Sequence, residues 1–328
     1  MSRNSAQRIH DLTADECQKA LVKLIQSFSH GHHLHTVFSD FVELSALAIS
    51  NSVDRSQYEA REKRYLDIIS KYKPEEVGRF PQMLGMLTES FEIRTQGMRK
   101  TSSAGLAMTS GGLTDVLGET YMMLELGNAR AGQFFTPYHV SRLMTMMTIG
   151  DGGAAVRDHG FMRVQEPACG AGGMVIAVAE SLHDAGHNYQ QAMHATCIDI
   201  DPCCVHMAFV QLSLLHIPAV IVHGNALTLD VWGLWYTPAH VLGGWSWKLR
   251  RSEAERRVAE SMGELDGEVD ETRAFDLPPA VAATRADFDA DIAVLEETQR
   301  SGVAQAVPAI AQSSAAKLFA KVDQLALF

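Results

Sequence analysis

The sequence reads Val164-Gln-Glu-Pro-Ala-Cys-Gly-Ala-Gly-Gly-Met-Val-Ile-Ala-Val178 midway along the chain. An apolar approach, a proline turn and a run of small residues lead into an apolar helical pattern. This order is typical of a strand, a tight loop and a helix N-terminus. Gly170, Gly172 and Gly173 can adopt backbone angles closed to other residues and let a ligand approach the main chain. The segment therefore predicts a ligand-binding loop after a buried strand.

Two later segments continue the same pattern. Ala195-Thr-Cys-Ile-Asp-Ile-Asp-Pro202 reads as a second buried strand that ends in acids, and Ala219-Val-Ile-Val-His-Gly-Asn-Ala226 reads as a third with a polar tip. In a parallel sheet the carboxyl ends of these strands meet at one edge, where nucleoside ligands bind. Asp199 takes the position of the acid that binds a ribose hydroxyl pair in such folds.

The glycine loop itself indicates which kind of nucleoside would bind. Gly170-Ala-Gly-Gly173 does not match the G-x-G-x-x-G pattern of dinucleotide sites, and no pyrophosphate cradle is evident. A nucleoside without phosphates fits this loop better. The sequence therefore predicts S-adenosylmethionine as the cofactor.

Four ordered motifs carry a family resemblance. They are Gly132-Gln-Phe-Phe-Thr-Pro137, Glu166-Pro-Ala-Cys-Gly-Ala-Gly-Gly173, Ile198-Asp-Ile-Asp-Pro202 and Gly224-Asn-Ala-Leu227. Together they resemble the motifs of the amino-group DNA methyltransferases, specifically the modification subunits of type I restriction systems. The resemblance covers about residues 110–230 and implies adenine-N6 methylation of DNA.

The resemblance also implies a set of cofactor-binding residues, which are Phe135, Thr136, Glu166, Ala168, Gly170, Gly172, Asp199 and Asn225. The loop with Thr136 would cover the methionine end, Asp199 would accept from the ribose hydroxyls, and Asn225 would read the adenine amino group. Two alternatives stay open. Thr136 before a proline is also typical of a helix cap, and a Gly-Asn pair is typical of a turn.

Composition and patterning predict three parts. We expect a helical N-terminal domain at residues 1–125, a Rossmann-like methyltransferase domain with a doubly wound, mostly parallel and truncated sheet at 126–248, and a charged helical and flexible tail at 249–328. No apolar run reaches the ~20 residues of a membrane span. Five cysteines without metal-ligand spacing favour a reducing cytoplasm. We interpret the histidine-rich segment Ser29–His35 as a polar turn and predict no metal site.

The catalytic loop of the family is missing from the sequence. These enzymes use Asn/Asp-Pro-Pro-Tyr/Phe to accept protons from the target amine and to stack on the flipped base, and no such tetrapeptide follows Asn225. Tyr236, with His240 nearby, is the remaining candidate. The four tryptophans of residues 232–247 could stack on a base or pack against the sheet.

The C-terminal residues Gln324-Leu-Ala-Leu-Phe328 resemble the peptide by which proteins bind the bacterial sliding clamp. Gln324, Leu325, Leu327 and Phe328 would be the contacts, and Ala326 departs from the pattern. An apolar terminus that packs on its own domain is the alternative.

Two functions are therefore open. The chain is either a DNA methyltransferase, or a catalytically inactive S-adenosylmethionine-binding scaffold or decoy that acts with partner subunits or with the clamp. Its net charge of −11 disfavours strong DNA binding by the chain alone, because duplex affinity depends on phosphate neutralisation. We expect a specificity subunit or a second methyltransferase subunit to supply that binding.

Overall fold

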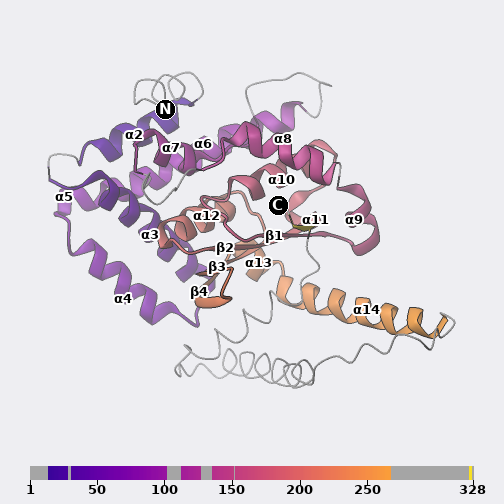
Figure 1. Cartoon of the computed structure of the whole chain (residues 1–328). Coiled ribbons are helices and arrows are strands. Elements are labelled where there is room, and N and C mark those ends of the chain that lie inside the picture. The colour runs from indigo at the N-terminus through magenta and orange to yellow at the C-terminus, as the bar shows by residue number, and fades with distance from the viewer. Residues whose placement is uncertain are drawn as a thin grey trace.

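The computed structural model of the chain describes residues 14–28, 31–101, 112–126, 135–150, 152–266 and 325–326. Within these residues, N-terminal helices pack against a small, mostly parallel sheet (Figure 1). No helix in this part of the chain has the length and apolar character needed to span a membrane.

Helices fill the N-terminal part, as the amphipathic spacing predicts. They are α2 (Glu16–Gln26), α3 (Leu34–Val53), α4 (Tyr58–Ile69), α5 (Pro74–Val77) and α6 (Arg79–Thr101). α2 begins after Asp15, whose carboxylate accepts from the N–H of Gln18 at 2.7 Å, a typical N-cap contact. Leu21 and Ile25 of α2 are fully buried, and α2 contacts α3 and α6. The apolar faces of these helices thus form one core.

Of the histidine-rich segment, Ser29 and His30 lie outside the described residues, His32 and His33 precede α3, and His35 belongs to α3. His32 Nε2 lies 3.3 Å from Glu76 Oε2, and its ring packs on Tyr72. Among the described residues, no group of three or more His, Cys, Asp or Glu side chains is placed to hold a metal ion.

Three helices lead from this layer to the sheet: α7 (Val116–Met123), α8 (Tyr138–Ile149) and α9 (Gly153–His159). α8 packs along α10 (Gly173–Asp184), and Glu180 joins the two because its carboxylate accepts from the Tyr138 hydroxyl at 2.8 Å. The same carboxylate accepts from the N–H of Leu113 at 3.1 Å. Glu180 therefore ties the segment before α7 to the helix that follows the glycine loop.

The sheet has the strand order β4-β3-β2-β1-β5. β1 (Met162–Glu166), β2 (Met193–Asp199) and β3 (Ala219–Asn225) are parallel, and α10, α11 (Tyr189–Ala192) and α12 (Pro202–Leu214) form their connections. These elements confirm the predicted fold class for the described residues, a helical part followed by a mostly parallel α/β sheet.

The aromatic segment after Asn225 forms a strand that we did not predict. β4 (Asp230–Tyr236) runs antiparallel to β3, with a register shift at His223 and Gly224. Trp235 of β4 packs on the Phe209 ring at 5.2 Å, and Trp245 is only 1% exposed. Packing is therefore the role of these two tryptophans, whereas Trp232 and Trp247 are half exposed.

At the opposite edge of the sheet, the described residues supply only a two-residue strand. β5 (Leu325–Ala326) pairs with Val164 and Gln165 only. α13 (Pro238–Leu242) and α14 (Trp245–Asp266) follow β4, and α14 projects away from the sheet (Figure 1). The boundary expected between residues 248 and 249 falls inside α14.

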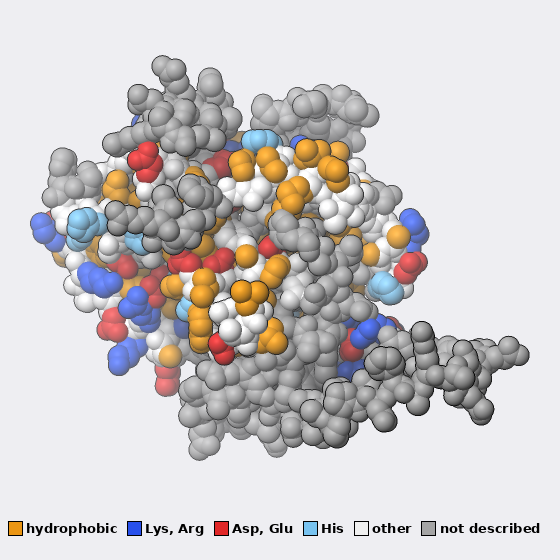
Figure 2. Space-filling model, in the orientation of Figure 1, with side chains coloured by type: hydrophobic (Ala, Val, Ile, Leu, Met, Phe, Trp, Pro, Cys, Tyr) orange, Lys and Arg blue, Asp and Glu red, His pale blue; other side chains and the backbone are white. Residues whose placement is uncertain are grey.

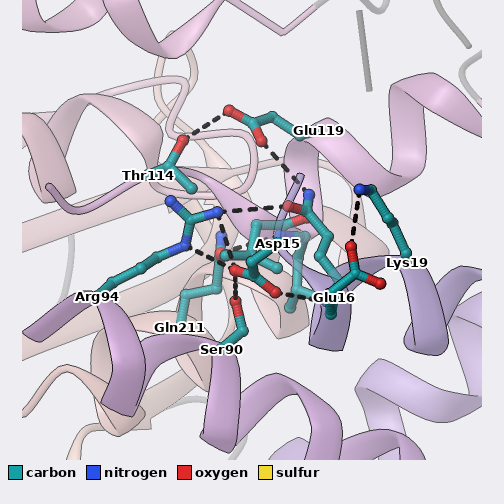
Figure 3. A network of polar contacts seen from close by, with 11 residues as sticks. Asp15, Glu16, Lys19, Ser90, Arg94, Thr114, Glu119 and Gln211 are labelled. Atoms are coloured by element: carbon teal, nitrogen blue, oxygen red, sulfur yellow. Dashed lines mark hydrogen bonds and ion pairs between the residues drawn. The ribbon is translucent and has the colours of Figure 1, made fainter. Parts of the chain in front are cut away.

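A polar network connects the helical layer to α7 (Figure 3). Asp15 Oδ2 accepts from the Ser90 hydroxyl at 2.6 Å and from Arg94 Nε at 3.1 Å. The Gln18 carboxamide, which has no exposed surface, donates to Glu119 and to the carbonyl of Val116 at 3.4 Å each. α2, α6 and α7 are thus held in one arrangement.

The second connection runs through Arg61 on α4. Its guanidinium donates to the Leu234 carbonyl at 2.9 Å and to Asp54 at 2.9 Å, and it lies 4.2 Å from the centre of the Trp235 ring. The side chains of Arg61 and Asp54 are 7% and 9% exposed. This ion pair therefore joins the helical layer to β4 in a setting shielded from water.

We expect Arg61→Met to lower the free energy of unfolding by about 3 kcal/mol, because it leaves the Asp54 carboxylate buried without its partner. Arg64→Met is the matched control, since the Arg64 side chain is 49% exposed and pairs with Glu43 at 2.6 Å. Its loss should cost less than about 1 kcal/mol. Urea unfolding of both variants measures the difference, and equal losses would contradict the role given to Arg61.

Candidate functional site

The pocket forms where β1 meets α10. β1 ends at Glu166, and the loop that follows turns into α10 at Gly173. Gly170 has φ +52°, and a Cβ there would lie 3.1 Å from the Phe135 ring. Both the backbone angle and the close approach require glycine. The loop therefore exposes its main chain beneath an aromatic ring.

Asp199 holds this loop against the end of β2. Its Oδ2 accepts from the N–H of Gly170 at 2.8 Å, and its Oδ1 accepts from the N–H of Asp201 at 2.9 Å. Burial raises the pKa of the Asp199 carboxyl, while these N–H donors oppose the shift. Each carboxylate oxygen can accept a further hydrogen bond, so Asp199 can also receive a pair of ligand hydroxyls.

Glu166 is the most unusual group of the pocket. The residue is 2% exposed, and its Oε2 is buried with no hydrogen-bond partner among the described residues. Its Oε1 accepts from the N–H of Ala168 at 3.3 Å. Burial, with the negative charge of Asp199 in addition, raises the pKa of Glu166 to about 7. A buried acceptor without a donor suits a ligand that brings a donor.

The structure brings five of the eight predicted cofactor residues to one pocket, which are Phe135, Thr136, Glu166, Ala168 and Gly170. The cap residue of α8 is Pro137, and no side chain caps that helix. The alternative role of Thr136 as a helix cap is therefore not observed.

Six further residues line the pocket that were not among the eight predicted cofactor-binding residues: Asp115, Ser141, Cys169, Ala171, Gly173 and Met174. Four of them belong to the glycine loop or to the first turn of α10. Asp115 and Ser141 come from α7 and α8, and only tertiary packing places them here. The sequence signal for Asp115 was its N-cap position before an apolar helix.

Asp115 is held by two donors. Its Oδ1 accepts from the N–H of Gly118 at 2.8 Å and from Gln211 Nε2 at 2.7 Å. Gln211 has no exposed surface and also donates to the carbonyl of Ala171 at 2.8 Å. Burial raises the pKa of Asp115 to about 6. The pocket therefore contains two buried carboxyls from different layers of the fold.

Three predicted cofactor residues do not line the pocket. Asp199 is not among the lining residues and contacts the loop through the N–H of Gly170, as described above. Gly172 has φ +91° and packs on α12, where a Cβ would lie 3.5 Å from Ala208. Asn225 Oδ1 accepts from the N–H groups of Leu227 and Thr228 at 2.9 and 3.4 Å. These contacts are those of a turn, the alternative role given above for the Gly-Asn pair.

The catalytic candidates Tyr236 and His240 are not at the pocket. Tyr236 pairs with Val220 near the start of β3, and β3 carries its carboxyl end away from that point. His240 Nδ1 lies 2.8 Å from His194 Nε2, near the start of β2, and burial lowers its pKa to about 4. Both residues therefore lie at the amino edge of the sheet, because β4 runs antiparallel to β3. We withdraw them as catalytic candidates.

Exposed apolar side chains surround the carboxyl ends of β2 and β3. Ile200, Leu227 and Trp232 are 59%, 94% and 50% exposed. Hydrophobic side chains gather over the β3–β4 hairpin and over α8 in Figure 2. Such patches mark a surface that can contact a ligand or another chain.

The clamp-type peptide falls mostly outside the described residues. Of its predicted contacts only Leu325 is described, as part of β5 beside Val164. Clamp binding through Gln324, Leu325, Leu327 and Phe328 stays a prediction.

Comparison with known proteins supports the family resemblance. Residues 113–242 match the family model described as N-6 DNA Methylase. This part of the chain is therefore similar to the N-6 DNA methylase family, and the cofactor prediction of S-adenosylmethionine agrees with that similarity. No match was found among curated proteins.

Two solved structures resemble the chain. One is a Listeria monocytogenes protein described as a class I S-adenosylmethionine-dependent methyltransferase, with 13% identity, a TM-score of 0.30, and coverage of 65% of this chain and 55% of that protein. The other is the methyltransferase subunit of a type I restriction-modification system from Streptococcus thermophilus, with 12% identity, a TM-score of 0.28, and coverage of 66% and 57%. The chain thus matches little more than half the length of either.

The raised pKa of Glu166 predicts that the free energy of unfolding depends on pH. The folded-state pKa of about 7 lies above the ordinary value of 4.5, so the fold favours the protonated acid. Its contribution to the free energy of unfolding is present below pH 4.5 and is lost as the pH rises to about 7. Glu166→Gln should therefore be more stable than the wild-type protein at pH 8 and equally stable at pH 4.5.

Thermal unfolding across this pH range measures the effect in the absence of ligands. The exposed Asp158→Asn serves as control and should follow the wild-type curve. Parallel curves for Glu166→Gln and the wild-type protein would contradict the assignment.

Proposed function

We propose that residues 113–242 bind S-adenosylmethionine and that the protein acts in adenine-N6 methylation of DNA, in the manner of a type I modification subunit. The observation that carries the proposal is the pair of acids at the glycine loop. Asp199 backs the loop at the end of β2, and Glu166 faces the pocket with an unpaired oxygen.

The charge of the pocket supports this cofactor over a phosphate-bearing nucleotide. Its lining residues include Asp115 and Glu166 and, among the described residues, no Lys, Arg or His. A pyrophosphate would meet two acids with no compensating cation, whereas the ammonium group of a zwitterionic amino-acid end would find acceptors. The polar and small residues of the loop leave room for a nucleoside against the main chain.

The residues present fit the cofactor at three points. Asp199 would accept from the ribose hydroxyls, the Phe135 ring would cover the loop, and Glu166 would accept from the amino-acid end. When bound, S-adenosylmethionine supplies a methyl group activated by its positive sulfur. The residues of the chain would orient the cofactor and exclude water from the pocket.

Transfer to adenine also needs an acceptor for the protons of the amine, because the amine lone pair is delocalised into the ring. No asparagine or tyrosine is among the described lining residues, and Tyr236 and His240 lie at the other edge of the sheet. This observation favours a second candidate function, a cofactor-binding scaffold that needs a partner chain for transfer.

The outer edge of β1 suits such a partner. Among the described residues, only Leu325 and Ala326 of β5 pair with this edge, so a partner strand that replaces β5 could pair along β1. A strand added parallel to β1 would end beside Glu166 and could bring an acceptor loop to the pocket. In either case we propose the cytoplasm as the location and DNA as the substrate.

We expect Asp199→Ala to abolish detectable binding of S-adenosylmethionine, because the ribose loses its shared acceptor and the loop loses the contact to Gly170. Asp230→Asn is the control, since Asp230 is an exposed acid at the start of β4 and outside the pocket. Isothermal titration calorimetry measures both. Unchanged affinity in Asp199→Ala would refute the pocket assignment.

Methyl transfer separates the two candidate functions. The protein is incubated with methyl-labelled S-adenosylmethionine and unmethylated DNA, and the nucleosides are analysed. Label in N6-methyladenine that disappears in Asp199→Ala supports the enzyme. Cofactor binding without transfer supports the scaffold, and the absence of any binding contradicts both.

A further inference from the structure

The first half of α14 carries a basic surface, although the net charge of the chain is −11. Between residues 245 and 257, five side chains are basic and two are acidic, which gives this stretch a net charge of +3. α14 projects away from the sheet (Figure 1). Positive charge is therefore concentrated on one projecting helix. The basic residues are Lys248, Arg250, Arg251, Arg256 and Arg257, and the acidic ones are Glu253 and Glu255.

The first turn of α14 is held against the amino edge of the sheet. Trp245 is 1% exposed, and the centre of its ring lies 5.0 Å from that of Phe161 and 5.3 Å from that of His194. Phe161 precedes β1, and His194 is the second residue of β2. The cofactor pocket lies at the other end of β1, beside Glu166. The basic surface is therefore separate from that pocket.

The outer face of this part of α14 combines an aromatic ring with arginines. Trp247, Arg250 and Arg251 are spaced three and four residues apart, so they lie on the same side of the helix, and all three are exposed. Trp247 is 57% exposed, and Arg251 Cζ lies 5.4 Å from the centre of its ring. Arg251 also pairs with Glu255 at 2.7 Å, but this pair is exposed and contributes less than about 1 kcal/mol. The guanidinium of Arg251 can therefore exchange this contact for an anion.

A second basic cluster lies one turn further along α14. Arg163 of β1, Arg256 and Arg257 all contact the carboxylate of Glu253, at 3.5, 3.1 and 3.3 Å. One carboxylate carries a single negative charge, so three guanidinium groups around it leave a local excess of positive charge. The side chains of Arg256 and Arg257 are each 33% exposed. This cluster therefore extends the positive potential of the helix.

The chemistry of the outer face suits a nucleic acid strand. Arginine binds phosphate through charge-assisted hydrogen bonds, and an exposed tryptophan ring can stack on an unpaired base. An acidic protein surface would use the arginines and have no need of the ring. A helix that lies on a membrane has an apolar face along its length. On α14, however, Trp247 is followed at helical spacing by Arg250, Arg251 and Ala254.

We propose that the outer face of α14, formed by Trp247, Arg250 and Arg251 with Arg257 beside them, binds a single-stranded segment of DNA. The arginines would bind phosphates, and the Trp247 ring would stack on a base. The choice of DNA among nucleic acids rests on the proposed function. Because the surface lies at the opposite edge of the sheet from the cofactor pocket, it attaches the DNA and does not hold the target base.

Titration of a labelled single-stranded oligonucleotide with the full-length protein, followed by fluorescence anisotropy at several salt concentrations, tests this inference. Trp247→Ala removes the ring, and Trp247→Phe restores an aromatic face. Arg250→Gln combined with Arg251→Gln removes two charges. The matched controls are Arg55→Gln and Tyr58→Ala, because Arg55 Cζ lies 5.5 Å from the centre of the exposed Tyr58 ring at the start of α4.

We expect Trp247→Ala to weaken the binding of the single strand about tenfold, which is the loss of one stacked base, and Trp247→Phe to recover most of it. The double arginine variant should lower the slope of log affinity against log salt by about 1.4, since each phosphate contact on a single strand contributes about 0.7. A duplex of the same sequence should respond to the arginine variant and not to Trp247→Ala. The control variants should bind as the wild-type protein does.

The opposite results would overturn the inference. They are a wild-type protein that does not bind the oligonucleotide at low salt, and α14 variants that bind it as the controls do. Binding to vesicles rich in anionic lipid that the α14 variants abolish, without binding to DNA, would assign the surface to a membrane and also overturn it.

The affinity for S-adenosylmethionine, measured on the same preparations, separates this inference from the proposed function. The α14 variants should keep the wild-type affinity for this cofactor, because the pocket lies at the other edge of the sheet. A protein that binds DNA through α14 but does not bind S-adenosylmethionine would refute the proposed function of the pocket and leave the role of α14 standing.

Discussion

The carboxamide of Gln211 is the interaction on which the arrangement of the site depends. It is fully buried on α12, accepts from the N–H of Leu117 at 3.0 Å, and donates to Asp115 and to the carbonyl of Ala171. One side chain thus holds the helix from the N-terminal layer, the glycine loop and the helix after β2. Because buried polar groups need partners, displacing any of these three elements would break at least one of these three hydrogen bonds.

A second constraint follows from the unpaired acids. The fold keeps Glu166 and Asp115 buried near one another without a cation among the described lining residues. Such an arrangement costs stability and raises both pKa values. Groups with shifted pKa values in a pocket are typical of functional sites. A positively charged ligand in the pocket would offset this loss of stability.

The direction of β4 also explains why its aromatic residues do not reach the pocket. The end of β1 and the loop that follows it line the pocket, and β4 closes the edge beside β3 by turning back toward the amino end. This reversal takes Tyr236 and His240 away from the pocket. The edge beside β1, where an added strand would approach Glu166, is covered by Leu325 and Ala326 alone among the described residues.

The sequence by itself determined the three parallel strands, the glycine loop and the acids near that loop. Apolar runs, glycines and polar residues at strand ends are properties of short segments. The sequence therefore located Gly170 in the pocket, and the family motifs added Phe135, Thr136, Glu166 and Ala168. Asp115 and the antiparallel β4 were decided only by tertiary structure. A capping aspartate looks the same in sequence whether or not Gln211, almost a hundred residues away, aims it into a pocket. The direction of β4 depends on a turn at Asn225 and on packing of Trp235 against α4 and α12, which are contacts that no local pattern records.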